Sequence, residues 1–100
     1  MIYVCSPYRG DIKRNIEFAK AACQFVRNYG LKPFAPHLVF TKYLDDNDPK
    51  QRRIGIALGI LIMRMCSEVW VFGSVISSGM QAEILNARKT RKVVRFWKPT

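Results

Sequence analysis

Short runs of apolar, β-forming residues alternate along this chain with longer segments of helical periodicity. The first run opens the sequence at 2–5, and further runs occupy 68–72 and 92–96. Continuous runs of this length are typical of strands that are buried on both faces of a parallel sheet. Residues 31–35 predict one more short strand, and Pro33 within it favours an edge position or the strand start.

Three longer segments repeat their apolar residues at the 3.6-residue period of a helix. They predict helices over 11–29, 49–66 and 78–88. Polar residues in 36–48 predict a loop between the second strand and the second helix. The predicted caps are Asp11 and Gly30 for the first helix, Asp48 with Gln51 for the second, and Ser78 with Gln81 for the third.

Strands and helices therefore alternate along the whole chain. This order implies right-handed crossovers and predicts an α/β fold, a small Rossmann- or flavodoxin-like three-layer domain whose parallel sheet of about four strands is flanked by helices. We expect a single domain over 1–100. Because ligands of such sheets bind beyond the carboxyl ends of the strands, a site is expected among the loops 6–10, 36–48 and 73–79.

The charge of the chain favours anionic partners. Lys and Arg number 17 against 7 Asp and Glu, which gives a formal net charge of +10. Phosphorylated small molecules, nucleic acid and acidic membrane surfaces all fit this excess. No membrane span is predicted, because the longest apolar run, 54–63, is about half of the roughly 20 residues that a span requires.

Cys5, Cys23 and Cys66 are odd in number and far apart, without a C-x-x-C pair or clustered histidines. Neither a disulfide framework nor a zinc site is therefore predicted. The sequence opens on a strand rather than on a basic segment followed by a long apolar run, so a secretory signal is not expected. These features together predict a cytoplasmic protein, and we expect no metal and no cofactor.

The start of the third predicted helix is the most informative segment for function. Ser77, Ser78, Gly79 and Met80 open this helix directly after a strand and a loop, so unpaired backbone amides face whatever binds there. This arrangement suits an anion or a ribose hydroxyl, and an ordinary capped helix start is the alternative. Glu83 follows one turn later on the same face, without a helical ion-pair partner at i+3 or i+4.

A desolvated Glu83 carboxylate is able to attack a sugar carbon and form a covalent glycosyl intermediate, as carboxylate nucleophiles do in retaining glycoside chemistry. A solvated surface glutamate is the alternative. Arg9 in the first loop is able to bind a phosphate through charge-assisted hydrogen bonds. In the alternative interpretation it belongs to a solvated basic face. His37 lines the expected site, or is a satisfied structural histidine.

Asp45, Asp46 and Asp48 concentrate three of the seven acidic residues in one loop. These side chains are suited to recognise a ribose or a base. They are also suited to bind a divalent cation, because such cations prefer carboxylate oxygens. In the alternative interpretation Asp48 is only a helix cap and the others are solvated. The full set of candidate substrate-binding residues is Ser6, Pro7, Arg9, His37, Asp45, Asp46, Gly73, Ser77, Ser78, Gly79 and Met80.

Three segments together resemble the nucleoside 2-deoxyribosyltransferase-like superfamily: 2–10 (IYVCSPYRG), 66–73 (CSEVWVFG) and 77–83 (SSGMQAE). With 36–38 (PHL) and 44–49 (LDDNDP), the chain is most similar to small uncharacterised bacterial and phage proteins grouped with that superfamily. The likeness covers nearly the whole chain.

The resemblance implies Glu83 as the catalytic nucleophile and Tyr8 as the catalytic aromatic residue that helps to place it. In the characterised transferases an aspartate two residues before the motif glycine assists at the sugar. Ser77 holds that place here. A serine hydroxyl binds a sugar hydroxyl, but it supplies no negative charge and is a poor acid or base near neutral pH.

Three functions follow as hypotheses. The first is an enzyme of the nucleoside or nucleotide N-glycosidic bond, a deoxyribosyltransferase or a hydrolase. The second is a non-catalytic protein that recognises or sequesters a nucleotide-derived small molecule, which tolerates Ser77. The third is a basic nucleic-acid-binding protein that uses the C-terminal residues Lys89, Arg91, Lys92, Arg95 and Lys98 with Phe96 and Trp97.

The helix predicted over 49–66 is apolar on nearly every side, with Gly55 and Gly59 spaced for close approach of another helix. A small sheet covers only one face of such a helix, so the remainder needs a partner. We therefore expect a homodimer or a higher homo-oligomer that is formed through this helix.

Overall fold

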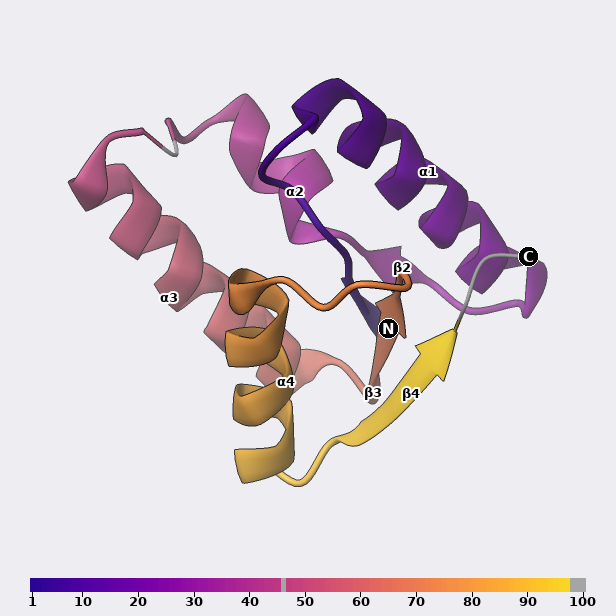
Figure 1. Ribbon diagram of the computed structural model, residues 1–100. Helices are drawn as coiled ribbons and strands as arrows, with labels where there is room; N and C mark the ends of the chain where they lie inside the picture. Colours follow the sequence, from indigo (N-terminus) through magenta and orange to yellow (C-terminus); the bar gives the residue numbers. More distant parts are fainter. Residues whose placement is uncertain (46, 98–100) are drawn as a thin grey trace.

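A computed structural model describes residues 1–45 and 47–97. Its elements are β1 (Ile2–Cys5), α1 (Ile12–Asn28), β2 (Pro33–Phe34), α2 (Pro36–Val39), the 3₁₀ turn η1 (Phe40–Lys42), α3 (Pro49–Met65), β3 (Glu68–Phe72), α4 (Ser78–Lys89) and β4 (Val93–Trp97). The four strands are parallel and lie in the order β2-β1-β3-β4 (Figure 1). The predicted α/β fold with a four-stranded parallel sheet is therefore confirmed.

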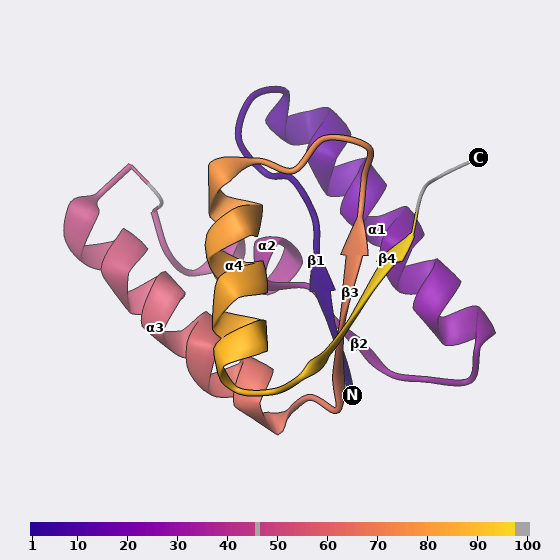
Figure 2. The same ribbon diagram turned by 60° about the horizontal axis from the view of Figure 1, so that its bottom comes forward.

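The sheet separates two helical layers (Figure 2). Side chains alternate across β1: Ile2 and Val4 pack toward α1, whereas Tyr3 and Cys5 pack with side chains of α3 and α4. Because all four of these residues are buried, β1 is apolar throughout rather than alternating, as expected for a central parallel strand. Tyr3 and Cys5 thus lie on the face of the sheet against which α4 packs.

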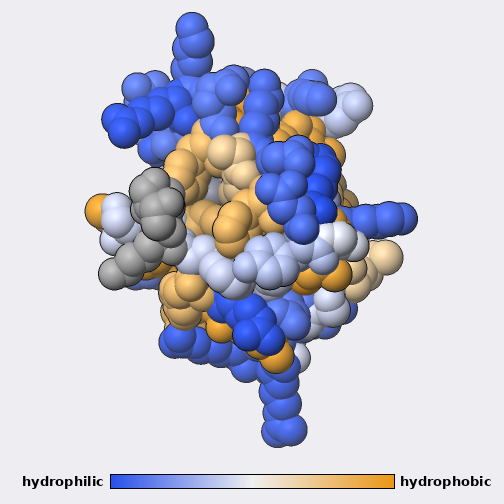
Figure 3. Space-filling model, turned by 90° about the vertical axis from the view of Figure 1, so that its right-hand side faces the viewer, coloured by the Kyte–Doolittle hydropathy of each residue, from blue (hydrophilic) through white to orange (hydrophobic). Residues whose placement is uncertain are grey.

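The opposite face is held by aromatic packing between α1 and the sheet. Phe25 of α1 and Tyr29, directly after its end, meet Trp70 of β3 and Trp97 of β4, and the Trp70 and Trp97 ring centroids are 5.0 Å apart. Figure 3 views the side on which the carboxyl end of β4 lies, where apolar side chains gather around a small hollow among hydrophilic neighbours. The aromatic layer between α1 and the sheet lies on the opposite side of the sheet from Glu83. Its role is therefore to stabilise the fold.

Helices α1 and α3 begin at their predicted caps and end within one residue of their predicted bounds. Asp11 caps α1 by accepting a hydrogen bond from the Arg14 N–H at 3.2 Å, and Gly30 adopts φ +76° just beyond the helix end. Asp48 caps α3 by accepting from the Lys50 N–H at 3.0 Å, with Pro49 as the first helical residue.

Two predictions of local structure are wrong. The predicted loop 36–48 contains α2 and η1, because Pro36 favours a helix start and the Thr41 hydroxyl donates to the His37 carbonyl at 2.6 Å. The N-cap of α4 is Ser77 rather than Ser78, since the Ser77 Oγ accepts from the Met80 N–H at 3.3 Å. Short-range side-chain hydrogen bonds decide both outcomes.

We expect Asp48→Ala to destabilise the protein by about 1 kcal/mol, because the substitution leaves N–H groups of the first turn of α3 without their cap. The matched control is Asp48→Asn, whose side-chain oxygen still accepts the Lys50 N–H and should keep most of the stability. Urea unfolding followed by circular dichroism measures both. Equal midpoints for Asp48→Ala and the wild type would contradict the capping role.

Candidate functional site

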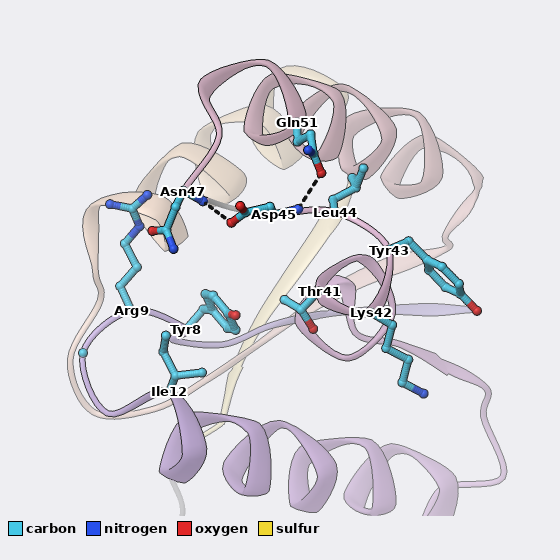
Figure 4. A pocket seen from close by; sticks show the side chains of 11 residues that line it. Tyr8, Arg9, Ile12, Thr41, Lys42, Tyr43, Leu44, Asp45, Asn47 and Gln51 are labelled. Carbon is cyan, nitrogen blue, oxygen red and sulfur yellow. Dashed lines mark hydrogen bonds between the residues drawn. The ribbon is translucent and has the colours of Figure 1, made fainter.

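Two adjoining pockets lie beyond the carboxyl ends of β1 and β3. The inner pocket has a volume of about 460 Å³ and is enclosed by the end of β1, α2, η1, α3 and the start of α4. The outer pocket, of about 540 Å³, is more open and lies between the β1–α1 loop and the segment that follows η1 (Figure 4). The residues that line both pockets are Tyr8, Arg9, Thr41, Leu44 and Gln51. The two pockets therefore form one continuous cleft.

Glu83 projects from α4 into the inner pocket, where β1 holds both of its oxygens. The Tyr3 hydroxyl donates a hydrogen bond to Oε2, and the Cys5 thiol lies 3.7 Å from Oε1. Tyr3 and Cys5 are two residues apart on one strand, so the pleat of the strand directs both side chains to the same face. The carboxylate orientation is thereby fixed by two donors from a rigid element.

Burial raises the pKa of Glu83 to about 7, while the hydrogen bonds from Tyr3 and Cys5 act in the opposite direction. Burial and the neighbouring Glu83 charge raise the pKa of the Tyr3 hydroxyl and of the Cys5 thiol well above their usual values. Both groups therefore keep their protons and remain donors. A carboxylate with this pKa is partly ionised near neutral pH, as a nucleophile or base in a binding pocket needs to be.

The start of α4 forms one wall of the inner pocket. Ser78 and Gly79 line it, and the first N–H groups of a helix have no partner within the helix. The Ser77 hydroxyl also lines the pocket, but it serves as the helix cap. Met80 is buried, and its carbonyl lies 3.9 Å from the Cys5 thiol. This wall thus presents backbone donors and the positive end of a helix dipole to a ligand.

Ser6 and His37 form the opposite part of the pocket. The Ser6 carbonyl accepts from His37 Nε2 at 3.0 Å, which fixes the imidazole, and the Tyr8 ring stacks on His37 with centroids 4.9 Å apart. The Ser6 hydroxyl is buried and has no hydrogen-bond partner within the described residues. The contribution of Ser6 to the site that the structure shows is therefore the backbone carbonyl that orients His37.

Helix α3 closes the inner pocket through its glycines. A Cβ at Gly59 would lie 3.4 Å from the Tyr3 hydroxyl oxygen, and one at Gly55 would lie 3.4 Å from Leu44 Cδ1. Gly55 and Gly59 were expected to admit another helix, but both line the pocket of their own chain. The missing side chains leave space for a ligand beside Tyr3 and Glu83.

The structure brings together most of the predicted site residues. Those that line the inner pocket are Ser6, Tyr8, Arg9, His37, Ser77, Ser78, Gly79, Met80 and Glu83. Asp45 lines the outer pocket instead, where its carboxylate accepts from the Asn47 N–H at 2.9 Å (Figure 4). Pro7 and Gly73 lie side by side and line neither pocket; a Cβ at Gly73 would be 3.8 Å from Pro7 Cδ. Asp46 lies outside the described residues.

Sequence reasoning missed Tyr3, Cys5 and Arg52 as site residues. Tyr3 and Cys5 belong to an apolar strand and carry no separate polar signal, and the hydrogen bond from Tyr3 to Glu83 joins residues 80 apart in the sequence. Arg52 on α3 lines the inner pocket with Arg9. Side chains alternate between the two faces of a strand, so Tyr3 and Cys5 share one face. This alternation was the signal in the sequence that could have identified them as a pair.

Two residues of the predicted nucleic-acid patch are engaged within the chain. Arg95 Nε lies 2.6 Å from Glu68 Oε1, and Lys92 Nζ donates to the Arg64 and Cys66 carbonyls at 2.9 and 2.7 Å. Across 1–45 and 47–97, no three His, Cys, Asp or Glu side chains come together as a metal site. In the same residues, no helix is long and apolar enough to cross a membrane.

A family model described as a domain of unknown function (DUF7768) matches residues 1–97. The chain belongs to this family. A search of curated proteins finds no match to this DUF7768 sequence. Among solved structures, a 2-deoxyribosyltransferase from the psychrotolerant bacterium Bacillus psychrosaccharolyticus is similar, with a TM-score of 0.80, 18% identity, and coverage of 99% of this chain and 72% of that chain. The DUF7768 chain therefore has a 2-deoxyribosyltransferase-like fold, as the sequence resemblance predicts.

We expect Tyr3→Phe to raise the pKa of Glu83 from about 7 to about 8 or higher, because the variant loses a hydrogen bond that favours the carboxylate. Carbon-detected NMR of the glutamate carboxyl groups, with Glu83 assigned by Glu83→Gln, measures this titration. The matched control is Tyr8→Phe, which should leave the Glu83 pKa unchanged. A shift in the control and none in Tyr3→Phe would assign the role of the tyrosine to Tyr8.

Proposed function

We propose that this DUF7768 protein cleaves or exchanges the N-glycosidic bond of a nucleoside or nucleotide, with Glu83 as the nucleophile. The observation that carries the proposal is the pair of donors, Tyr3 and Cys5, that holds both oxygens of a carboxylate with a raised pKa inside a ligand-sized pocket. A solvated surface glutamate would have neither the burial nor the two donors.

The proposed reaction has two steps. The Glu83 carboxylate attacks the anomeric carbon, the bond from that carbon to the base breaks, and its electron pair leaves with the base. A water molecule or a second base then attacks the same carbon, loses one proton to solvent and releases Glu83 as a carboxylate, while the departed base takes up one proton from solvent. The outcome is hydrolysis in the first case and glycosyl transfer in the second.

The remaining polar groups of the inner pocket would bind and orient the substrate. The N–H groups at the start of α4 face the space that a sugar hydroxyl or a phosphate would occupy. The stacked pair Tyr8 and His37 offers an aromatic surface for a base. These contacts hold the anomeric carbon near Glu83, and such positioning contributes to the rate.

A second candidate is a binding protein that recognises a nucleotide-derived small molecule without turnover. Ser77 favours it, because this hydroxyl replaces the aspartate that the superfamily resemblance implies and is occupied as the cap of α4. Both candidates use the same pocket. They differ in whether Glu83 reacts.

We expect Glu83→Gln to abolish turnover while the fold is retained, because the amide is a poor nucleophile. Wild-type activity should rise with pH, reach half of its maximum near the Glu83 pKa of about 7 and level off about one unit above it, since the ionised form of Glu83 attacks. A pooled set of nucleosides and nucleotides, followed by mass spectrometry of released bases and retained ligands, provides the measurement. Retained ligand without released base would favour the binding protein, and equal turnover by the folded variant would refute the nucleophile.

We expect Ser77→Asp to increase turnover of deoxynucleosides by about tenfold or more, because it restores a carboxylate near the sugar. Aspartate is as good an N-cap as serine, so α4 should stay folded. Ser77→Asn is the matched control that keeps the cap without the charge. Equal rates for the two variants would show that a charge at position 77 does not limit the reaction.

We also propose a homodimer through the outer face of α3. Ile54, Leu58, Leu61 and Met65 follow the spacing i, i+4, i+7, i+11 and are 49%, 38%, 53% and 77% exposed, so they form one apolar stripe on the helix. A stripe of this kind is self-complementary across a twofold axis, where two copies of it would pack against each other. This surface is separate from the glycine face that lines the pocket.

We expect Leu61→Glu to yield monomers, because it places a charge in the middle of that stripe. Lys13→Gln is the control, since it lies on α1 on the other side of the sheet and changes the net charge by the same amount. Light scattering at tens of micromolar reports the mass. A wild-type monomer at that concentration would rule out the dimer.

A further inference from the structure

The inner pocket contains few groups that are able to donate a proton to a leaving base. Among its described lining residues, Glu83 is the one carboxylate, and a nucleophile that has lost its proton does not serve as the acid of the same step. Arg9 and Arg52 also line the pocket, but a guanidinium does not release its proton in proteins. Asp45 lines the outer pocket, and its carboxylate accepts the Asn47 N–H.

Tyr3 and His37 do not fill this gap. Tyr3 directs its proton to Glu83, and burial and that carboxylate raise the pKa of its hydroxyl, which makes it a poor acid. His37 directs Nε2 to the Ser6 carbonyl; because a carbonyl only accepts, this nitrogen carries a proton that is committed to the backbone. The Tyr8 ring lies flat against His37, at an interplanar angle of 23°.

An N-glycoside with a neutral base needs such an acid, because the base otherwise departs as an anion. A base that is already positively charged departs as a neutral molecule. In that case the electron pair of the broken C–N bond neutralises the ring nitrogen, Glu83 forms an ester with the anomeric carbon, and no proton is transferred. Water then adds to the anomeric carbon, releases Glu83 and loses one proton to solvent, which balances the overall hydrolysis.

We propose that the substrate of this site is a nucleotide whose base carries a positive charge, such as a pyridinium or an N-alkylated purine. The inference rests on the proposed function and defines its substrate class. It is supported by the groups of the cleft: a cationic ring in the inner pocket would share it with the Glu83 carboxylate and with Tyr8, an aromatic residue of the kind that attracts cations.

The arginines fit the other end of such a molecule. Arg9 lines both pockets, where they join, and Arg52 lines the inner one. Their side chains suit a phosphate through charge-assisted hydrogen bonds. A substrate that is cationic at the base and anionic at the phosphate therefore matches the single carboxylate and the two guanidinium groups of the cleft.

The test compares two matched pairs of probes at pH 8, above the Glu83 pKa of about 7. The purine pair is 7-methyl-2′-deoxyguanosine 5′-monophosphate and 2′-deoxyguanosine 5′-monophosphate. The pyridine pair is nicotinamide mononucleotide and its reduced, uncharged form, which has nearly the same shape. Released base is quantified by chromatography for the wild type and Glu83→Gln. Three further variants, Tyr8→Phe, His37→Gln and Asp46→Asn, test for a hidden proton donor, and a selective loss of the neutral substrate in Tyr8→Phe would identify Tyr8 as the acid and overturn the inference.

We expect the charged member of at least one pair to be cleaved with a kcat/KM about 10² to 10⁴ times that of its neutral partner, which is the factor that a general acid otherwise contributes. Glu83→Gln should remove this activity, and His37→Gln and Asp46→Asn should affect both members of a pair equally. The pair that responds identifies the kind of base.

Comparable Glu83-dependent cleavage of charged and neutral partners would overturn the inference while the proposed function stands. A selective loss of the neutral substrate in His37→Gln or Asp46→Asn would also overturn it, because that residue would then be the acid. Absence of any Glu83-dependent cleavage, for all four probes and the pooled nucleosides, would overturn the proposed function and this inference together.

Discussion

The hydrogen bond from Tyr3 to Glu83 joins the first strand of the chain to its last helix, and the candidate site depends on it. Burying a carboxylate costs free energy unless hydrogen-bond donors replace the water that it loses. Tyr3 and Cys5 supply those donors from the central strand of the sheet, where neighbouring strands hold the backbone on both sides. The result is a carboxylate that is fixed in orientation and is still able to ionise near neutral pH.

Helix α3 carries apolar residues on two faces that have different surroundings. Its inner face carries Gly55 and Gly59, which keep the helix backbone close to Leu44 and Tyr3 and leave the pocket open. Its outer face carries large apolar side chains that the described residues leave exposed. A substitution on the inner face of α3 would therefore change the space in the pocket, whereas one on the outer face would change an exposed apolar surface.

The distribution of charge gives the cleft a consistent chemical character. The chain has ten more basic than acidic residues, and the inner pocket combines Arg9 and Arg52 with one described carboxylate. The basic side chains and the carboxylate of the pocket thus come from different elements: Arg9 from the β1–α1 loop, Arg52 from α3 and Glu83 from α4. The hydroxyl of Ser77, which caps α4, adds no charge to this arrangement.

The sequence by itself determined the local elements and the fold class. Continuous apolar runs predicted β1 and β3 with their observed bounds, and Asp11 and Asp48 cap the helices for which they were predicted. These signals act within a few residues along the chain, so a pattern of neighbours is enough to detect them. The alternation of strands and helices then restricted the topology to a parallel sheet with its ligand site at one edge.

Only the tertiary structure decided which side chains meet at that edge. Tyr8 was the aromatic partner that the superfamily resemblance implied for Glu83, whereas the observed hydrogen bond comes from Tyr3, which the apolar pattern had presented as an ordinary core residue. Gly59 likewise faces Tyr3 rather than a foreign helix. Contacts of this kind depend on the order of the strands and on how closely helices approach the sheet. Both are set by packing over the whole chain, and no local pattern in the sequence records them.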